Sequence, residues 1–125
     1  MVNQQLSDTV LAFTGPDVRS VLHGQSTRNF KTLTLNTPVD GAFCDLKGRV
    51  IADFSAIAVA DERILLRTDT GVASALTAHL SKYLMFSKTT VTALGWTCWG
   101  CSGDVSTYRS DITISRGNQH FELWQ

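Results

Sequence analysis

The sequence predicts an α+β fold, in which an antiparallel sheet carries two helices on one face. Two segments repeat apolar residues at helical spacing, and several others alternate apolar and polar residues as strands do. Short, hairpin-like connections join the alternating segments, which favours antiparallel pairing. A chain of 125 residues is long enough for one hydrophobic core, so we expect a single domain over residues 1–125.

Two helices are predicted. The run Thr14-Gly15-Pro16-Asp17 favours a start for a helix near 16–23, because proline suits the first turn and an early aspartate suits the positive end of the helix dipole. Gly24 can end this helix. A second helix is predicted over 71–83, capped by Asp69 or Thr70. Its expected inward stripe consists of Val72, Ala75, Leu76, His79, Leu80 and Tyr83.

The predicted strands surround these helices. Residues 50–60 alternate strictly, with apolar side chains on both faces, so this strand should be partly buried on both sides. The turn Asp61-Glu62-Arg63 joins it to a strand over 64–68. The other β segments are residues 9–13, residues 38–44 with the turn Asp45-Leu46-Lys47-Gly48, a β-rich region over 88–101, and a hairpin over 111–124 that turns at Arg116-Gly117-Asn118.

The composition excludes several classes of partner. With 11 basic and 11 acidic residues the formal net charge is zero, so nothing draws the chain to nucleic acid or to an anionic membrane surface. The apolar runs are too short to span a bilayer, and residues 1–5 lack the layout of a signal peptide. Three cysteines form no disulfide framework, so we expect a cytoplasmic protein. A neutral chain also does not oppose self-association.

The pair Cys98-Trp99-Gly100-Cys101 has the spacing of a metal or redox motif. A structural zinc site needs four ligands, and only Cys44 and three scattered histidines could complete one, namely His23, His79 and His120. We therefore expect structural cysteines and no bound metal. No nucleophile–base arrangement, phosphate loop or dinucleotide fingerprint is present, so no catalytic residue is predicted.

Three stretches carry a family resemblance. They are residues 22–27 (Leu-His-Gly-Gln-Ser-Thr), residues 44–50 (Cys-Asp-Leu-Lys-Gly-Arg-Val) and residues 80–88 (Leu-Ser-Lys-Tyr-Leu-Met-Phe-Ser-Lys). Together they resemble the amino-terminal part of the YgfZ family of folate-binding proteins, relatives of the T-protein (aminomethyltransferase) of the glycine cleavage system. The third stretch matches the family pattern Lys-Tyr-x-x-Phe-Ser-Lys at every specified place. The resemblance extends over residues 6–105 and implies the folate-binding region of that fold.

The resemblance implies a site for tetrahydrofolate or another folate, and each candidate residue has a chemical reason. A carboxylate can receive the paired N–H groups of a pterin, cations suit the glutamyl tail, and aromatic rings can flank the aminobenzoyl group. Each stretch also has a purely structural interpretation, as a β-turn, a polar helix end or an aromatic helix anchor. The candidate folate-binding residues are Gln25, Thr27, Asp45, Lys47, Arg49, Tyr83 and Phe86.

The chain departs from its relatives in two places. Ala52 and Asp53 align with a pair of aspartates in T-proteins, so one carboxylate is absent. The Lys-Gly-Cys-aromatic-x-Gly-Gln-Glu motif of YgfZ proteins is also absent, and none of the three cysteines has its context. Aminomethyl transfer is therefore not expected, and an enzyme ranks last among the hypotheses. The first hypothesis is a folate-binding module without catalysis of its own, in the context of iron–sulfur cluster assembly or repair that the resemblance implies.

The second hypothesis is a self-associating interaction domain that reuses the fold. In the relatives two further domains cover part of this one, so an apolar surface should be left bare here and a homodimer is expected. The candidate surface is the terminal hairpin, with Phe121, Leu123 and Trp124.

Overall fold

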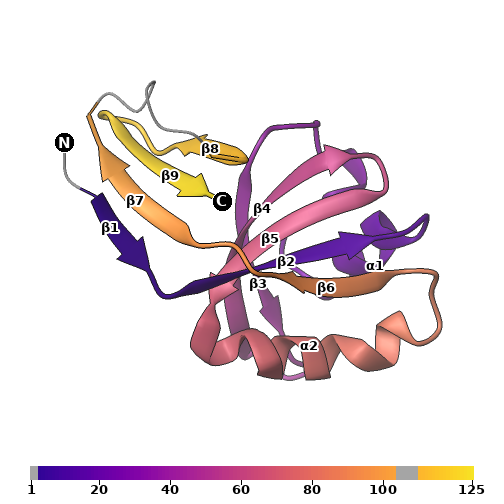
Figure 1. Cartoon of the computed structure of the whole chain (residues 1–125). Helices are drawn as coiled ribbons and strands as arrows, with labels where there is room; N and C mark the ends of the chain where they lie inside the picture. Colours follow the sequence, from indigo (N-terminus) through magenta and orange to yellow (C-terminus); the bar gives the residue numbers. More distant parts are fainter. Residues whose placement is uncertain (1–2, 104–109) are drawn as a thin grey trace.

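The structure is a computed structural model that describes residues 3–103 and 110–125 (Figure 1). Over those ranges it confirms the α+β prediction, with two α-helices, a short 3₁₀ helix and antiparallel strands. The elements in chain order are β1 (Asn3–Leu6), β2 (Asp8–Thr14), α1 (Val18–Gln25), η1 (Phe30–Thr32), β3 (Val39–Cys44), β4 (Val50–Ala60), β5 (Arg63–Asp69), α2 (Thr70–Leu84), β6 (Thr90–Leu94), β7 (Cys98–Ser102), β8 (Ile112–Ser115) and β9 (His120–Trp124).

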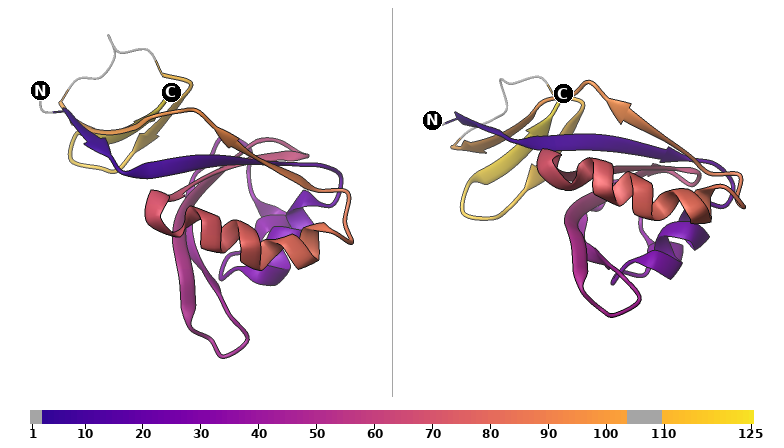
Figure 2. Two further views of the ribbon diagram at one scale, coloured as in Figure 1. Left: turned by 60° about the horizontal axis from the view of Figure 1, so that its bottom comes forward. Right: turned by 90° about the horizontal axis from the view of Figure 1, so that it is seen from below.

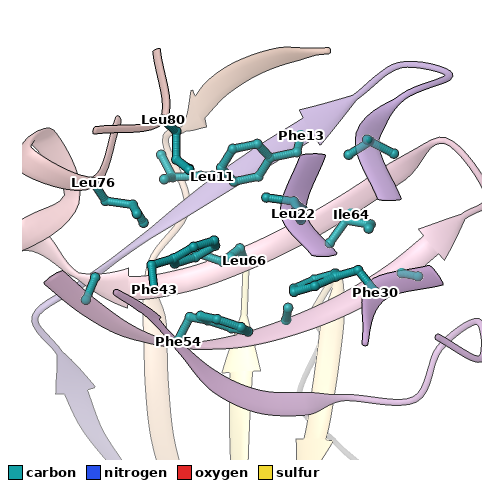
Figure 3. Close-up of a cluster of buried hydrophobic side chains, with 14 residues drawn as sticks. Leu11, Phe13, Leu22, Phe30, Phe43, Phe54, Ile64, Leu66, Leu76 and Leu80 are labelled. Carbon is teal, nitrogen blue, oxygen red and sulfur yellow. The ribbon is translucent and has the colours of Figure 1, made fainter. Parts of the chain in front are cut away.

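A five-stranded antiparallel sheet forms the centre of the molecule, in the order β3-β4-β5-β2-β6. Both helices cover the same face of this sheet, as predicted (Figure 2). The main core lies between the two helices and the central sheet, and Figure 3 shows its aromatic centre. There the ring of Phe54 lies 4.9 Å from that of Phe43 and 5.7 Å from that of Phe30, between ring centroids. Such tilted aromatic contacts add to the energy of burial itself.

The other face of the central sheet packs against a second sheet, of order β1-β7-β9-β8. This division of the strands between two sheets is a feature that the sequence pattern did not indicate, and β1 is an additional strand. A second core fills the space between the sheets, with Val10, Ala12, Ile57, Leu65, Cys98, Ile114 and Trp124. Strand β4 therefore contributes Phe54 to one core and Ile57 to the other, which confirms its predicted burial on both sides.

Helix α1 begins two residues later than predicted, at Val18. Pro16 and Asp17 form the turn before it, and the Asp17 carboxylate accepts a hydrogen bond of 3.0 Å from the backbone N–H of Lys88. The helix also continues through Gly24 to Gln25. The carboxylate of Asp17 therefore joins the start of α1 to the connection between α2 and β6.

Helix α2 begins as predicted, because the Asp69 carboxylate accepts a hydrogen bond of 2.7 Å from the N–H of Gly71. Leu76 and Leu80 are fully buried, as the periodic stripe indicated. The stripe is wrong at one position, since Ala73 is buried and Ala75 is exposed. Neither helix in the part of the chain that the structure describes is long and apolar enough to cross a membrane.

The terminal hairpin turns where predicted but does not present the expected apolar surface. Trp124 is fully buried in the core between the sheets, and Leu123 is only 3% exposed. The indole N–H of Trp124 donates to the Glu122 carboxylate at 3.2 Å, which satisfies its polar atom inside the core. The prediction that this hairpin forms an exposed association surface is therefore wrong.

Candidate functional site

The three motif stretches, far apart in the sequence, meet around one cleft of about 230 Å³. We call it the motif cleft. The end of α1 forms one wall, the turn between β3 and β4 a second, and the last turns of α2 a third. Four of the candidate residues lie in its lining, which consists of Gly24, Gln25, Ser26, Thr27, Cys44, Asp45, Leu46, His79 and Tyr83.

The segment after α1 is held against the edge strand β3. The N–H of Thr27 donates to the carbonyl of Ala42 at 2.9 Å, and the N–H of Ala42 donates back to the Thr27 hydroxyl at 3.0 Å. A β-bridge joins Ser26 to Phe43. Close approach is possible because a Cβ at Gly41 would lie 2.7 Å from the Arg28 side chain. These contacts fix the segment after α1 along β3, where it covers part of the edge of the central sheet.

The second wall is the turn at Asp45, whose carboxylate is engaged within the turn. Its Oδ1 accepts hydrogen bonds from the N–H groups of Lys47 and Arg49 at 2.9 and 3.0 Å. Its Oδ2 accepts from Arg49 Nε at 2.9 Å. The N–H of Arg49, helped by its guanidinium and by the N–H of Lys47, lowers the pKa of Asp45. This geometry supports the β-turn interpretation, because Oδ1 already accepts two hydrogen bonds and so the two oxygens together cannot receive the paired N–H groups of a pterin.

Lys47 and Arg49 do not belong to the lining of the motif cleft. Both side chains are exposed, and that of Arg49 lies against Asp45. Gly48 has a φ of 79°, which turns the chain sharply between the two cations. Figure 2 shows the β3–β4 hairpin, in purple, extending past α2. The expected contact between these cations and a glutamyl tail stays a prediction.

The third wall comes from α2. The rings of His79 and Tyr83, one helical turn apart, lie 5.9 Å from each other between centroids. Nε2 of His79 is buried and has no hydrogen-bond partner among the described residues. Sequence reasoning treated His79 as a core residue. The predicted inward stripe already placed His79 and Tyr83 on one face of α2, and the structure places both residues on the same wall of the cleft.

Phe86 lies outside the cleft. It is 89% exposed and follows the end of α2 at Leu84, next to Met85, which is 71% exposed. The prediction that this aromatic residue anchors the helix end in the core is wrong. Tyr83 takes that role, since it is half-buried and packs against the main core.

A second cavity, of about 400 Å³, lies over β3, β4 and β5, and we call it the junction cavity. Its lining is Asp40, Gly41, Asp53, Phe54, Ser55, Arg67 and Arg116. Asp53, which aligns with the T-protein aspartates, lies here and not in the motif cleft. The position that aligns with the T-protein aspartates therefore lies apart from the cleft that the three motif stretches form.

An ion-pair network joins the two sheets beside this cavity. Glu122 receives Arg67 Nε at 2.7 Å and Arg116 Nε at 2.7 Å. Arg67 also pairs with Asp8 at 3.2 Å, and Arg116 pairs with Asp40 at 3.0 Å. These five residues, together with Ser55, form what we call the junction network. No sequence motif indicated it, because its partners lie up to 76 residues apart.

The carboxylates of the network differ in their pKa values. Burial by itself would raise the pKa of Asp40, but the hydrogen bond from Ser55 and the charge of Arg116 lower it overall. Burial raises the pKa of Asp8, and the charge of Arg67 does not fully offset this effect. Burial therefore disfavours the charged form of Asp8 in the folded chain, although its carboxylate pairs with Arg67 at 3.2 Å.

The cysteines are free thiols, with Cys98 and Cys101 buried and Cys44 half-buried at the motif cleft. Burial, together with the nearby carboxylate of Asp8, raises the pKa of Cys98 to about 12. A thiol of this kind stays protonated at neutral pH and is chemically inert. Over residues 3–103 and 110–125 no group of three or more His, Cys, Asp or Glu residues could hold a metal ion. The expectation of a metal-free protein stays a prediction.

Comparison with known proteins gives the fold. No protein-family model matches the chain, and no curated protein matches its sequence. The chain is similar to the crystal structure of the glycine cleavage system aminomethyltransferase T from Bartonella henselae, with a TM-score of 0.79 and 15% sequence identity. The match covers 98% of this chain and 41% of that one, so this chain spans less than half of that protein. The expected likeness to the T-protein is therefore confirmed at the level of the fold.

Proposed function

We propose that this chain is a non-catalytic module that binds a reduced folate in the motif cleft. One observation carries the proposal: the three stretches that resemble folate-binding relatives, separated in the sequence, line a single cleft. The similarity in fold to an aminomethyltransferase of the glycine cleavage system also supports the proposal. Gln25 and Thr27 form one side of the proposed site and Tyr83 the other.

The roles of these side chains follow from their chemistry. The Gln25 amide offers both a donor and an acceptor to the edge of a heterocycle. The ring of Tyr83 offers a flat surface, and aromatic stacking contributes about 0.5–1.5 kcal/mol beyond the buried area. Asp45 holds the turn that forms the third side of the site. It acts on the shape of the cleft and makes no direct contact with the ligand.

Affinity should be low. Sites that enclose a drug-sized ligand usually measure about 300–1,000 Å³, and the motif cleft measures about 230 Å³. Only part of a folate can enter such a cleft, so most of the ligand surface stays in water. We expect a dissociation constant weaker than about 1 µM, which corresponds to about 8 kcal/mol of binding free energy.

Calorimetry with tetrahydrofolate tests the proposal and the choice of cavity. Tyr83→Leu should weaken binding at least about fivefold, a loss of about 1 kcal/mol, because it removes the flat wall of the cleft. Asp53→Asn is the matched control, since it alters the junction cavity only. If Asp53→Asn abolishes binding and Tyr83→Leu does not, the folate occupies the junction cavity. If the unaltered chain binds no folate, the function itself is refuted.

The proposed setting is the cytoplasm, in support of iron–sulfur cluster assembly or repair. The support for this setting is the resemblance to YgfZ proteins and the three free thiols, which suit a reducing compartment. Cells that lack this protein should then lose activity of iron–sulfur enzymes under oxidative stress. Unchanged activity of those enzymes would remove this part of the proposal and leave folate binding untouched.

The alternative function, a self-associating domain, rests on a different observation. Four large apolar side chains are strongly exposed near the hairpin tip and after α2, and we call them the apolar rim: Leu46, Val50, Met85 and Phe86. If these side chains form one contiguous patch, that patch would suit association with a second copy of the chain. Sedimentation at micromolar concentration should show a dimer that Leu46→Ser and Phe86→Ser together convert to a monomer. A monomer of 13.7 kDa before any substitution rejects this alternative.

A further inference from the structure

The two edge strands of the central sheet, β3 and β6, differ in how the chain covers them. Along β3, the segment after α1 bonds to the backbone of Ala42 at 2.9 and 3.0 Å, and the Arg28 side chain donates to the carbonyl of Asp40. Strand β6 pairs with β2 on one side, and no described strand pairs with its other side. In the right-hand view of Figure 2, β6 (orange) lies at the upper margin of the molecule. Its free backbone groups can therefore receive another strand.

The ends of β2 show which backbone groups of β6 face outward. Ser7 and Gly15, at the two ends of β2, both hydrogen-bond toward β5, at 2.9 Å. A residue in an antiparallel sheet directs its N–H and C=O to the same neighbour, and this direction alternates along the strand. The even-numbered residues of β2 therefore bond to β6, where they pair with residues 90, 92 and 94. The N–H and C=O groups of Val91 and Ala93 are consequently the ones that face outward.

The surface beside this edge carries no charge. Residues 70–81 of α2 and residues 90–94 of β6 contain no aspartate, glutamate, lysine or arginine, although 18% of the chain is charged. A helix face in water usually carries charged residues, yet the outer face of α2 exposes Ser74, Ala75 and Ala78. A groove of about 510 Å³ lies between α2 and the β2–β6 pair, and Ala93 belongs to its lining. Depletion of charge is typical of the centre of a protein interface.

We propose that the edge of β6 is a dimer interface, where a second copy of the chain pairs its own β6 in antiparallel orientation. The two central sheets then form one continuous sheet across a two-fold axis near Thr92. The inference does not depend on folate binding, and it places the expected homodimer contact on a surface other than the terminal hairpin and the apolar rim. Strand β6 contains none of the lysine, proline or bulge that commonly prevent pairing at an edge.

The strand is complementary to itself in this orientation. With Thr92 opposite Thr92 of the second copy, Val91 of each copy lies opposite Ala93 of the other. These are the residues whose backbone groups face outward, so each of these pairs can exchange both of its hydrogen bonds. Two threonines directly opposite each other also favour pairing. Because the surface is uncharged, the two-fold axis brings no like charges together, which favours a second copy over a charged partner.

The side chains fit this arrangement as well. Ala93 lines the groove, and Val91 packs against the main core from the same side of the sheet. In the dimer, Val91 of the second copy would lie beside Ala93 at the open side of the groove, so an apolar side chain would cover surface that water now contacts. The contact is confined to one short strand and the groove beside it, so the dimer should be weak, with a dissociation constant of about 10 µM.

Two measurements on the full chain test the interface. Sedimentation velocity between about 1 and about 200 µM should show a monomer that converts to a dimer. Amide hydrogen exchange, followed by NMR at both concentrations, locates the contact. The amides of Val91 and Ala93 should exchange at least about tenfold more slowly in the dimer, and that of Thr92, which already bonds to β2, should not change. A monomer at the higher concentration, or a dimer in which Val91 and Ala93 exchange as in the monomer, would overturn the inference.

Two proline variants test the outward direction of Ala93. Ala93→Pro removes the outward N–H and leaves the bonds between β6 and β2 intact, so the dimer should be lost while the unfolding temperature changes little. Ala93→Ser is the matched control, since it keeps the N–H and should still form the dimer. Thr92→Pro removes a bond to β2 and should lower the unfolding temperature instead. Equal destabilisation by both prolines would contradict the assigned direction.

A charged variant separates this interface from the apolar rim. Ala93→Lys places a charge at the edge without altering the backbone, so it should give a folded monomer. Leu46→Ser together with Phe86→Ser should leave the dimer unchanged, because both residues lie outside β6. Loss of the dimer in that double variant, with the dimer retained in Ala93→Lys, would place the contact at the apolar rim and refute the inference.

Discussion

Removal of the buried Glu122 carboxylate should strongly destabilise the protein. Glu122 accepts from two arginines, at 2.7 Å from Arg67 Nε and 2.7 Å from Arg116 Nε, and also from Trp124 at 3.2 Å. Its side chain is only 11% exposed. In Glu122→Ala both guanidinium groups lose their shared acceptor, and the buried indole of Trp124 loses its partner.

The size of the effect follows from what remains. Breaking a buried ion pair on one side costs about 3–5 kcal/mol. Arg67 keeps Asp8, and Arg116 keeps Asp40, so we take the lower end, about 3 kcal/mol. For a chain of this size each kcal/mol lowers the unfolding temperature by about 3–5 °C, so the midpoint should fall by about 10–15 °C.

Urea denaturation followed by tryptophan fluorescence, together with a thermal scan, measures both quantities. Glu62→Ala is the matched control, because Glu62 is an exposed acid on the turn between β4 and β5. It should change stability by less than about 0.5 kcal/mol. A loss below about 1 kcal/mol in Glu122→Ala, similar to that of an exposed pair, would show that the junction network does not hold the two sheets together.

Three further changes have defined outcomes. Gly15→Ala should lower the free energy of unfolding by at least about 2 kcal/mol, because Gly15 has a φ of 142° and a Cβ there would clash with the carbonyl of Lys88. The control is Gly24→Ala, whose Cβ would meet open space. It should be neutral or stabilising in the same denaturation assay. The pKa of Asp40 is lowered in the folded protein, so its carboxylate contributes stability that is present above pH 3.8 and is lost as the pH falls through this lowered pKa. Asp40→Asn should therefore lower the stability at pH 7. It should also flatten the dependence of stability on pH below pH 3.8. In the native protein a thiol reagent at pH 8 should label Cys44 first and leave Cys98 unmodified until unfolding, and fast labelling of Cys98 would contradict its burial. Elemental analysis of the purified protein should find far less than one zinc or iron per chain.

Local features were predictable from the sequence because they depend on neighbouring residues. The alternation in β4, the Asp69 cap of α2 and the turn at Gly117 each involve residues within a few positions of one another. The match of the motif stretches to a known fold was also readable, and the shared fold with the aminomethyltransferase confirms it. The candidate site was predictable only as a set of stretches, of which Gln25, Thr27, Asp45 and Tyr83 reach the cleft.

The tertiary structure alone decided which surfaces these elements bury. Alternation of apolar and polar residues places the apolar side chains on one face of a strand, but it does not indicate whether a helix or another sheet covers that face. The sequence therefore did not reveal that Trp124 lies between two sheets and not in solvent. The exposure of Phe86 depends on the path of the chain after the end of α2. The pairing of Arg67 with Glu122 joins residues 55 positions apart, and no local pattern contains it. Contacts of this kind arise only when the whole chain is compact, because burial then forces each charged group to find a partner.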